Sequence, residues 1–216
     1  MDNPQASTDR VYAPTADRVL AACEQFDQDE RPTEWVLTKL FQKFPENTDF
    51  DEVVVKTKVL NILYSTQIRA VNEVARHICN LAIDPDLRAG KPGIVDRIAV
   101  VTMSASGKKR RNYSFASKYC SWHNPCSYPI WDSRVKAYLT WLRQRPEGRF
   151  LVKNPDSWTE YAEFVDMINN LRELNKLGEF SFKQIDKVLY TEGGKLIAEE
   201  ERLRAAKKDT AASTQL

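Results

Sequence analysis

Apolar side chains recur three and four residues apart over most of the chain, which is the spacing of helices with one buried face. Only 7 glycines are present, and runs of alternating β-branched residues are rare, which argues against a β-sandwich or a Rossmann-type sheet. The pattern therefore predicts an all-α fold, with helices over 15–26, 33–44, 51–64, 71–81, 94–103, 115–122, 132–142, 157–171, 181–189 and 198–208.

Three of these helices have a clear start signal. Asp132, Asp156–Ser157 and Ser181 each stand immediately before an apolar periodic run, where a side-chain oxygen can accept hydrogen bonds from the free N–H groups of the first turn. Three tryptophans at helical spacing, Trp35, Trp141 and Trp158, are expected in the core.

The chain shows no internal repeat and no linker, so we expect one folded unit over 14–208. The polar ends, 1–13 and 209–216, are predicted to be disordered. No apolar stretch reaches the roughly 18–20 residues that a membrane span needs, and the first residues lack the apolar region of a secretory signal. We therefore expect a cytoplasmic protein that contacts no membrane, and a monomer, since nothing indicates a coiled coil.

Charge and cysteine content narrow the function only a little. The net charge is +2 over 216 residues, so a nucleic-acid site would have to come from local clusters of Lys and Arg.

The spacings His77-x-Cys79 and Cys120-x-x-His123-x-x-Cys126 resemble fragments of a zinc site, but no CxxC pair anchors them. Free thiols and imidazoles packed in or near the core are the preferred interpretation, with no metal and no cofactor.

Three polar segments stand out against the helical pattern. The first is Leu63-Tyr64-Ser65-Thr66-Gln67, where a helix ends in a polar turn. The second is the basic run Lys108-Lys109-Arg110-Arg111, which leads into Ser114-Phe115-Ala116. The third is Tyr128-Pro129-Ile130-Trp131-Asp132-Ser133-Arg134-Val135-Lys136.

Together these segments resemble the helix-hairpin-helix DNA glycosylase superfamily over roughly residues 53–142. Adenine glycosylases of that superfamily carry F-P-I-x-D-x-x-V-K around the catalytic aspartate, and this chain has Y-P-I-W-D-S-R-V-K, which makes Asp132 the matching carboxylate. The polar turn is similar to the family's S-x-Q, whose glutamine probes the DNA stack, a role that falls to Gln67. Ala116 lies sixteen residues before Asp132, as does the alanine of the family's T-A pair.

The sequence also departs from the family pattern. The family's L-P-G-V-G hairpin grips a phosphate through backbone amides, whereas this chain has the glycine-free run from Lys108 to Arg111, so the hairpin itself is in doubt. Ser114 stands where bifunctional members carry their Schiff-base lysine, which implies base removal without strand cleavage. Lys118 lies one helical turn further on the same face, so it remains an alternative for the Schiff-base lysine. The iron–sulfur cysteines of several members are absent.

The resemblance implies a two-lobed helical fold with the active-site cleft between a central lobe, 50–131, and a second lobe, 14–49 with 132–208. It implies a monofunctional glycosylase that flips a modified base out of double-stranded DNA and hydrolyses its N-glycosidic bond. Relatives that act on glucosylated cytosines of phage DNA make a bulky base one candidate. We assign catalysis to Asp132 and DNA contact to Gln67, Lys108, Lys109, Arg110, Arg111, Ser114, Lys118 and Arg134.

The base pocket is assigned to aromatic residues near the site, namely Tyr64, Tyr119, Trp122, His123 and Trp131. For His123 a core imidazole, a base contact and a phosphate contact all stay open. Two other functions remain alternatives: a helical DNA-binding module without enzymatic activity, in which Asp132 is only a helix cap, and a helical RNA-binding protein that uses the same basic loop.

Overall fold

The protein is described by a computed structural model that covers residues 11–213 except 30, 105, 150, 152, 153 and 156. It is mostly helical, as expected, with one two-stranded sheet in the described part. The elements are α1 Ala16–Asp29, α2 Arg31–Lys43, α3 Phe50–Leu63, α4 Val71–Asn80, α5 Asp84–Arg88, α6 Gly93–Ala99, β1 Val100–Thr102, β2 Lys109–Arg111, α7 Tyr113–His123, α8 Ser133–Arg143, the 3-10 turn η2 Pro146–Gly148, α9 Tyr161–Leu174 and α10 Phe182–Ser213.

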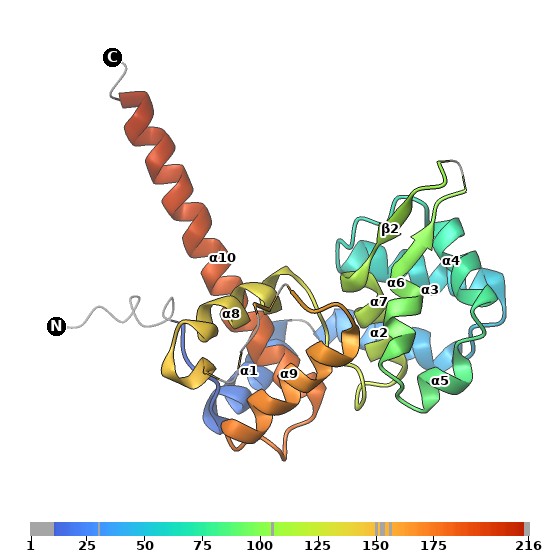
Figure 1. Ribbon diagram of the computed structural model, residues 1–216, viewed down its shortest axis with the longest axis horizontal. Coiled ribbons are helices and arrows are strands. Elements are labelled where there is room, and N and C mark those ends of the chain that lie inside the picture. The colour runs from blue at the N-terminus through green and yellow to red at the C-terminus, as the bar shows by residue number, and fades with distance from the viewer. Residues whose placement is uncertain are drawn as a thin grey trace.

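The helices gather in two groups (Figure 1). Helices α3 to α7 and the two strands form one group, and α1, α8, α9 and α10 form the other. Helix α2 contacts α1 as well as α3 and α7, and α6 contacts α9, so packing is continuous from one group to the other. None of the helices in the described residues combines the length and apolarity that crossing a bilayer requires.

The expected helix over 94–103 is wrong in its second half. Helix α6 ends at Ala99, and β1 follows with Val100 paired to Arg111 and Thr102 to Lys109 in an antiparallel ladder. The β-branched run from Val100 to Thr102 favours an extended strand, and Gly107, with φ +65°, provides the left-handed residue in the connection. A β-hairpin therefore joins α6 to α7.

Several element ends also differ from the sequence prediction. Helix α9 begins at Tyr161 rather than at the predicted Asp156–Ser157 cap, of which Asp156 lies outside the described residues. The two helices predicted over 181–189 and 198–208 are one helix, α10. Its far end projects away from the other helices (Figure 1).

The chain ends also depart from their prediction. Of the tail expected to be disordered, 209–213 belong to α10 and 214–216 lie outside the described residues. At the other end, 1–10 are outside the description, but 11–13 are half-buried. Tyr12 N–H donates to Glu192 and its carbonyl accepts from the Tyr138 hydroxyl, at 3.1 and 2.8 Å, so this segment is fixed on α8 and α10.

Helix α10 is held against α8 by a close approach of the two backbones. A Cβ atom at Gly193 would lie 2.0 Å from the Arg134 carbonyl oxygen, a distance at which the helices must separate. A Cβ atom at the neighbouring Gly194 would meet only the end of the Arg134 side chain, at 3.4 Å. Gly193 is therefore required for packing and Gly194 is not.

We expect Gly193→Ala to lower the free energy of unfolding by about 1–3 kcal/mol, since a methyl group against a backbone carbonyl forces the helices apart. Gly194→Ala is the matched control, and it should be neutral or stabilising by up to about 1 kcal/mol because alanine is the better helix former. Urea denaturation of both variants measures the difference. Equal stability of the two variants would contradict the close packing of α8 on α10.

Candidate active site

A cavity of about 560 Å³ opens between α2, α7 and the first half of α10. One part of its lining is aromatic and includes Phe41, Tyr64 and Trp122. Another part carries charges, among them Asp132, Lys118 and Asp186. A volume of this size lies within the range of small-molecule sites in proteins. The cavity thus combines flat apolar surfaces with ionisable groups.

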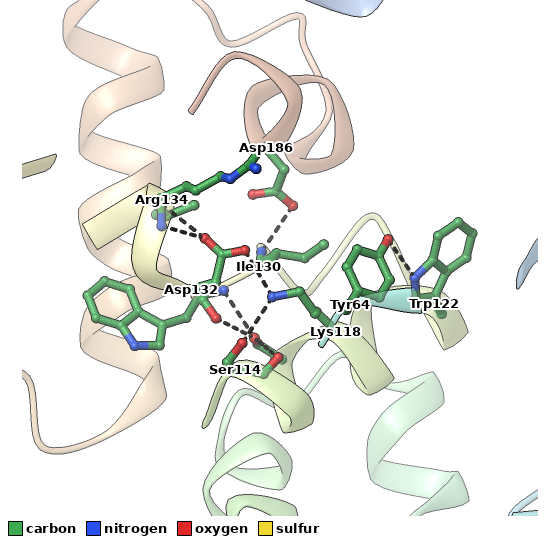
Figure 2. A network of polar contacts seen from close by, with 11 residues as sticks. Tyr64, Ser114, Lys118, Trp122, Ile130, Asp132, Arg134 and Asp186 are labelled. Carbon is green, nitrogen blue, oxygen red and sulfur yellow. Dashed lines mark hydrogen bonds and ion pairs between the residues drawn. The ribbon is translucent and has the colours of Figure 1, made fainter. Parts of the chain in front are cut away.

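Asp132 is the N-cap of α8, as the sequence predicts, and both of its oxygens are held. Its Oδ1 accepts the backbone N–H groups of Arg134 and Val135, each at 3.1 Å. Its Oδ2 lies 2.9 Å from the Lys118 ammonium nitrogen (Figure 2). The start of a helix favours negative charge, and the cap orients the carboxylate. With its side chain 12% exposed, Asp132 is fixed and still borders the cavity.

Lys118 reaches this carboxylate from α7. Its side chain is 4% exposed, and its ammonium group also donates to Ser114 Oγ at 3.0 Å. The nitrogen lies 5.3 Å from the centre of the Tyr64 ring, within the range of a cation–π contact. Ser114, Lys118 and Asp132 are thus in one cluster (Figure 2), although fourteen residues separate the lysine from the aspartate.

The loop before Asp132 is fixed by two residues that sequence reasoning missed. Ser117 Oγ accepts the Trp131 N–H at 3.0 Å and lies 3.3 Å from the Trp131 carbonyl. Asp186 Oδ2 accepts the Ile130 N–H at 3.0 Å. A signal for Asp186 was present, because it falls at helical spacing between the buried Phe182 and Leu189 of α10, where an apolar side chain is expected.

Tyr64 and Trp122, two of the predicted pocket residues, line the cavity together. The Trp122 indole N–H donates to the Tyr64 hydroxyl at 3.2 Å. The Lys183 ammonium lies 4.4 Å from the centre of the Trp122 ring and pairs with Glu34 at 3.0 Å. These contacts hold the aromatic wall in one orientation.

His123 also lines the cavity, and its half-buried ring lies in a setting that favours the neutral imidazole. Phe41 packs edge-on against it at 4.8 Å, and the Lys56 ammonium lies 3.5 Å from Nε2. Burial, with the nearby Lys56 charge, lowers the pKa of His123 to about 3. This environment therefore disfavours the protonated imidazole that a phosphate contact would need.

This environment predicts acid sensitivity. Between pH 6.5 and about 3 the unfolded state binds a proton at His123 that the folded state does not, so stability falls as pH falls through this window. The slope from this group is at most about 1.4 kcal/mol per pH unit. His123→Gln should reduce the dependence of the free energy of unfolding on pH, as measured by urea unfolding at several pH values between 7 and 4. An unchanged slope would contradict the neutral state of the half-buried ring.

Two of the predicted pocket residues do not line the cavity, and one predicted core residue is exposed. Tyr119 is fully buried, and its hydroxyl donates to Asn47. Trp131 packs edge-on against Trp158 and Phe164 at 5.3 and 5.1 Å, on the side of α9. Trp35, expected in the core, is 62% exposed. Helical spacing predicts which residues share one face of a helix. It does not predict whether that face is turned toward the core, the cavity or solvent.

None of the predicted DNA-contact residues outside the cluster lines the cavity. Gln67 is exposed in the turn after α3, with φ +59°, and Ser65 has φ +49°. Asn61 holds this turn, because its side chain bonds both the N–H and the carbonyl of Ile68 at 2.8 and 2.9 Å. Two left-handed non-glycine residues in one short turn store backbone strain. The turn begins at Tyr64, which lines the cavity.

The basic run and Arg134 occupy different settings. Lys108 and the three residues of β2, from Lys109 to Arg111, are all exposed directly before the first turn of α7, which carries Ser114. The Arg134 guanidinium instead lies over the Tyr190 ring at 3.9 Å, so it is partly covered. Four positive charges therefore stand in solvent next to the helix end that holds Ser114.

Residues of the two spacings that resemble zinc fragments have different settings in the structure. The His77 ring faces the Arg97 carbonyl at 2.8 Å, Cys120 is buried and Cys126 is exposed. Across the described residues no three His, Cys, Asp or Glu side chains are arranged to hold a metal ion. The cysteines described are free thiols.

Comparisons with known proteins give a relationship without a described activity. A protein family described as an N-terminal domain matches residues 18–127, about half of the chain, and the match ends before Asp132. An uncharacterized protein of the bacterium Haemophilus influenzae is 30% identical over 149 residues, which cover 68% of this chain and 69% of that protein. No solved structure matches the chain.

Proposed function

The chain belongs to the HI_0787_N family, and we propose that it is a monofunctional DNA glycosylase that removes a modified base. The observation that carries this proposal is the Asp132 carboxylate. It caps α8, pairs with Lys118 at 2.9 Å and borders a cavity of about 560 Å³ with aromatic walls.

The reaction needs a carboxylate in this setting. Cleavage of the N-glycosidic bond builds positive charge on the sugar, and a fixed negative group stabilises it most strongly where water is excluded. The same carboxylate can orient the attacking water and accept its proton. The cap bonds to Arg134 and Val135 hold Asp132 in place before the substrate arrives, so little reorganisation is needed.

The contacts of the nearby lysine support base removal without strand cleavage. Ser114, at the position of the Schiff-base lysine in the resembled family, is a weak nucleophile. Lys118 is close, but its ammonium group donates to both Asp132 and Ser114, and an ammonium has no lone pair with which to attack the sugar. In this proposal Lys118 orients Asp132 and does not form a covalent intermediate.

The cavity supports a flipped base as the ligand. Tyr64 and Trp122 offer rings for stacking, which contributes about 1–3 kcal/mol per base. The lining also includes polar side chains such as Thr33, Thr38 and Gln42, which could bond to a substituent on the base. We therefore favour a base with a bulky polar substituent, such as the glucosylated cytosine of some phage DNA, which would make this protein part of antiviral defence.

Double-stranded DNA is the proposed partner, and the exposed basic residues give the contact surface. Lys108 and β2 are positioned to bind phosphates beside the end of α7 that carries Ser114. We also propose that DNA binds in a cleft between two helical lobes. Side chains of the β-hairpin would then contact the phosphate that backbone amides of the hairpin contact in the resembled family. It also includes a monomeric, cytoplasmic protein.

Gln67 is proposed to fill the space that the flipped nucleotide leaves. Its strained turn begins at the cavity wall, and an exposed side chain there can enter the DNA stack. We expect Gln67→Ala to slow excision from double-stranded DNA by roughly 10-fold, because the unstacking cost of a few kcal/mol is no longer offset. Excision from single-stranded DNA, where little unstacking is needed, should be unchanged.

The control for that experiment is Gln28→Ala, at an exposed position of α1 outside the cavity lining, and it should excise at the wild-type rate on both kinds of DNA. An equal loss of activity on both kinds of DNA in Gln67→Ala would contradict the wedge role. It would point instead to damage to the turn and to Tyr64.

The proposal is tested by incubating the protein with duplexes that each carry one oxidised, alkylated, mismatched or glucosylated base. The strands are analysed before and after heating in alkali, which breaks DNA at abasic sites. Breaks that need alkali support monofunctional base removal, whereas breaks without alkali implicate Lys118 or another amine. Tight DNA binding without any break would overturn the proposal and favour a DNA-binding module, and preferential binding of RNA would favour the third alternative.

A further inference from the structure

Asp186 is a buried carboxyl group at the cavity that the proposed mechanism has not used. It lies on α10, 7% exposed, and it belongs to the lining of the cavity. Its Oδ2 accepts the Ile130 N–H at 3.0 Å (Figure 2). Its Oδ1 is buried and has no hydrogen-bond partner among the described residues. A buried polar atom without a partner is costly and calls for an explanation.

The groups around Asp186 do not favour a second negative charge. Asp132 on α8 repels it, while Lys118 on α7 and Lys183 on its own helix attract it. Lys118 is already bonded to Asp132, and Lys183 to Glu34. Tyr64 and Tyr161 each interact electrostatically with Asp186, and the Arg134 guanidinium lies over the Tyr190 ring.

Burial, reinforced by the charge of Asp132, raises the pKa of Asp186 well above its ordinary value, although the Ile130 N–H lowers it. This direction favours the protonated, neutral carboxyl over the carboxylate. A neutral carboxyl can donate a hydrogen bond from one oxygen while it accepts with the other. On the neutral group Oδ2 accepts from the backbone, and a hydroxyl at Oδ1 would be a donor without an acceptor among the described residues, which leaves it available to a ligand in the cavity.

We propose that Asp186 is the catalytic acid of this site, which gives its proton to the departing base while Asp132 stabilises the sugar. This inference rests on the proposed glycosylase function. Two carboxyl groups border the same cavity, one held by a cap and an ion pair and the other buried, and such a difference in environment is the division of roles that acid–base catalysis needs.

The bond between C1′ and the base nitrogen breaks, and its electron pair goes to the base. The Asp186 proton moves to a ring nitrogen or carbonyl oxygen of the base, which leaves as a neutral molecule. A water oxygen bonds to C1′, and the water proton goes to Asp132. Proton exchange with solvent then returns Asp132 to the carboxylate and Asp186 to the acid.

The protonation state is tested on the protein alone, without substrate. Carbon-13 NMR of protein labelled at aspartate carboxyl carbons should show one protonated carboxyl at pH 7, and Asp186→Asn should remove that signal. The asparagine oxygen still accepts from Ile130, so the loop before Asp132 keeps its bond. Asp166→Asn, at an exposed position of α9, is the control and should leave the signal in place. An ionised Asp186 at pH 7 would overturn the inference.

The catalytic role is tested on whichever duplex of the panel the wild-type protein cleaves. Asp186→Asn should lower the excision rate by roughly 10²–10⁴-fold, as expected for loss of a general acid. The alkaline limb of the wild-type pH–rate profile, where Asp186 loses its proton, should also disappear. A variant that keeps the wild-type rate and profile would overturn the acid role alone. If the wild-type protein releases no base from any duplex, the glycosylase proposal fails and the acid role fails with it, whatever the NMR spectrum shows.

Discussion

The Asp132→Asn variant is expected to release base on the order of 10³-fold more slowly than the wild-type protein while binding DNA equally well. Asparagine keeps an oxygen that can accept from Arg134 and Val135, so the cap of α8 is retained. It loses the negative charge that stabilises the sugar cation and the group that accepts the proton from water. The excision rate under single-turnover conditions, together with a DNA-binding isotherm, measures the two effects separately.

Asp166→Asn on α9 is the control for this variant, and it should be fully active, because the side chain is exposed. Circular dichroism should show unchanged helix content in both variants. An Asp132→Asn protein that excises at the wild-type rate would remove the catalytic assignment and leave this residue as a helix cap only. A protein that loses activity and DNA binding together would indicate a structural effect.

The second large effect is expected on stability, from Lys56→Met in α3. The Lys56 ammonium group donates to the Phe44 and Glu46 carbonyls and to Asn47 Oδ1, at 3.0, 2.7 and 2.8 Å, and the residue has no exposed surface. Methionine fills a similar volume but leaves these buried acceptors without a donor. The expected loss is about 3 kcal/mol or more, which corresponds to a decrease in Tm of roughly 6–12 °C.

Lys58→Met provides the matched comparison, because Lys58 lies on the same helix and is exposed. It should change the free energy of unfolding by less than about 0.5 kcal/mol. Burial lowers the pKa of Lys56 to about 8, so the folded state loses its proton more readily than the unfolded state and stability should rise between pH 8 and 10.5. Equal stability of the two variants at pH 7 would show that the buried network contributes little.

The predicted features that the structure confirms depend on local sequence. The helical pattern predicts most helices to within a few residues, since amphipathic spacing acts within one element. The N-cap position of Asp132 is confirmed for the same reason, because the aspartate bonds N–H groups only two and three residues away. Local chemistry was enough to place the carboxylate at the start of a helix.

Features that depend on tertiary contacts could not be predicted from the spacing of residues along the chain. The contact of Lys118 with Asp132 requires the turn between α7 and α8 to bring the helices together, and spacing along the chain does not define that turn. Asp186 comes from α10, far away in sequence. Tyr119 and Trp131 were assigned to the pocket by proximity in sequence, but neighbours along a helix or loop point in different directions.

The β-hairpin shows a competition between two local preferences. The apolar run from Ile94 to Met103 fits a helix by its hydrophobicity, yet its second half is β-branched and has a partner strand, Lys109–Arg111, within reach of a short turn. Pairing with that strand satisfies the backbone groups of Val100 to Thr102. The basic run is thereby held extended, with its side chains in solvent.

The most direct measurement is the detection of free base by mass spectrometry after the protein is mixed with the panel of modified duplexes, with wild-type protein and Asp132→Asn side by side. The account predicts that the wild-type protein releases one kind of base and leaves an abasic strand of full length, and that the variant releases almost none. Equal release by both proteins, or no released base with either, would contradict the central role of the Asp132 carboxylate.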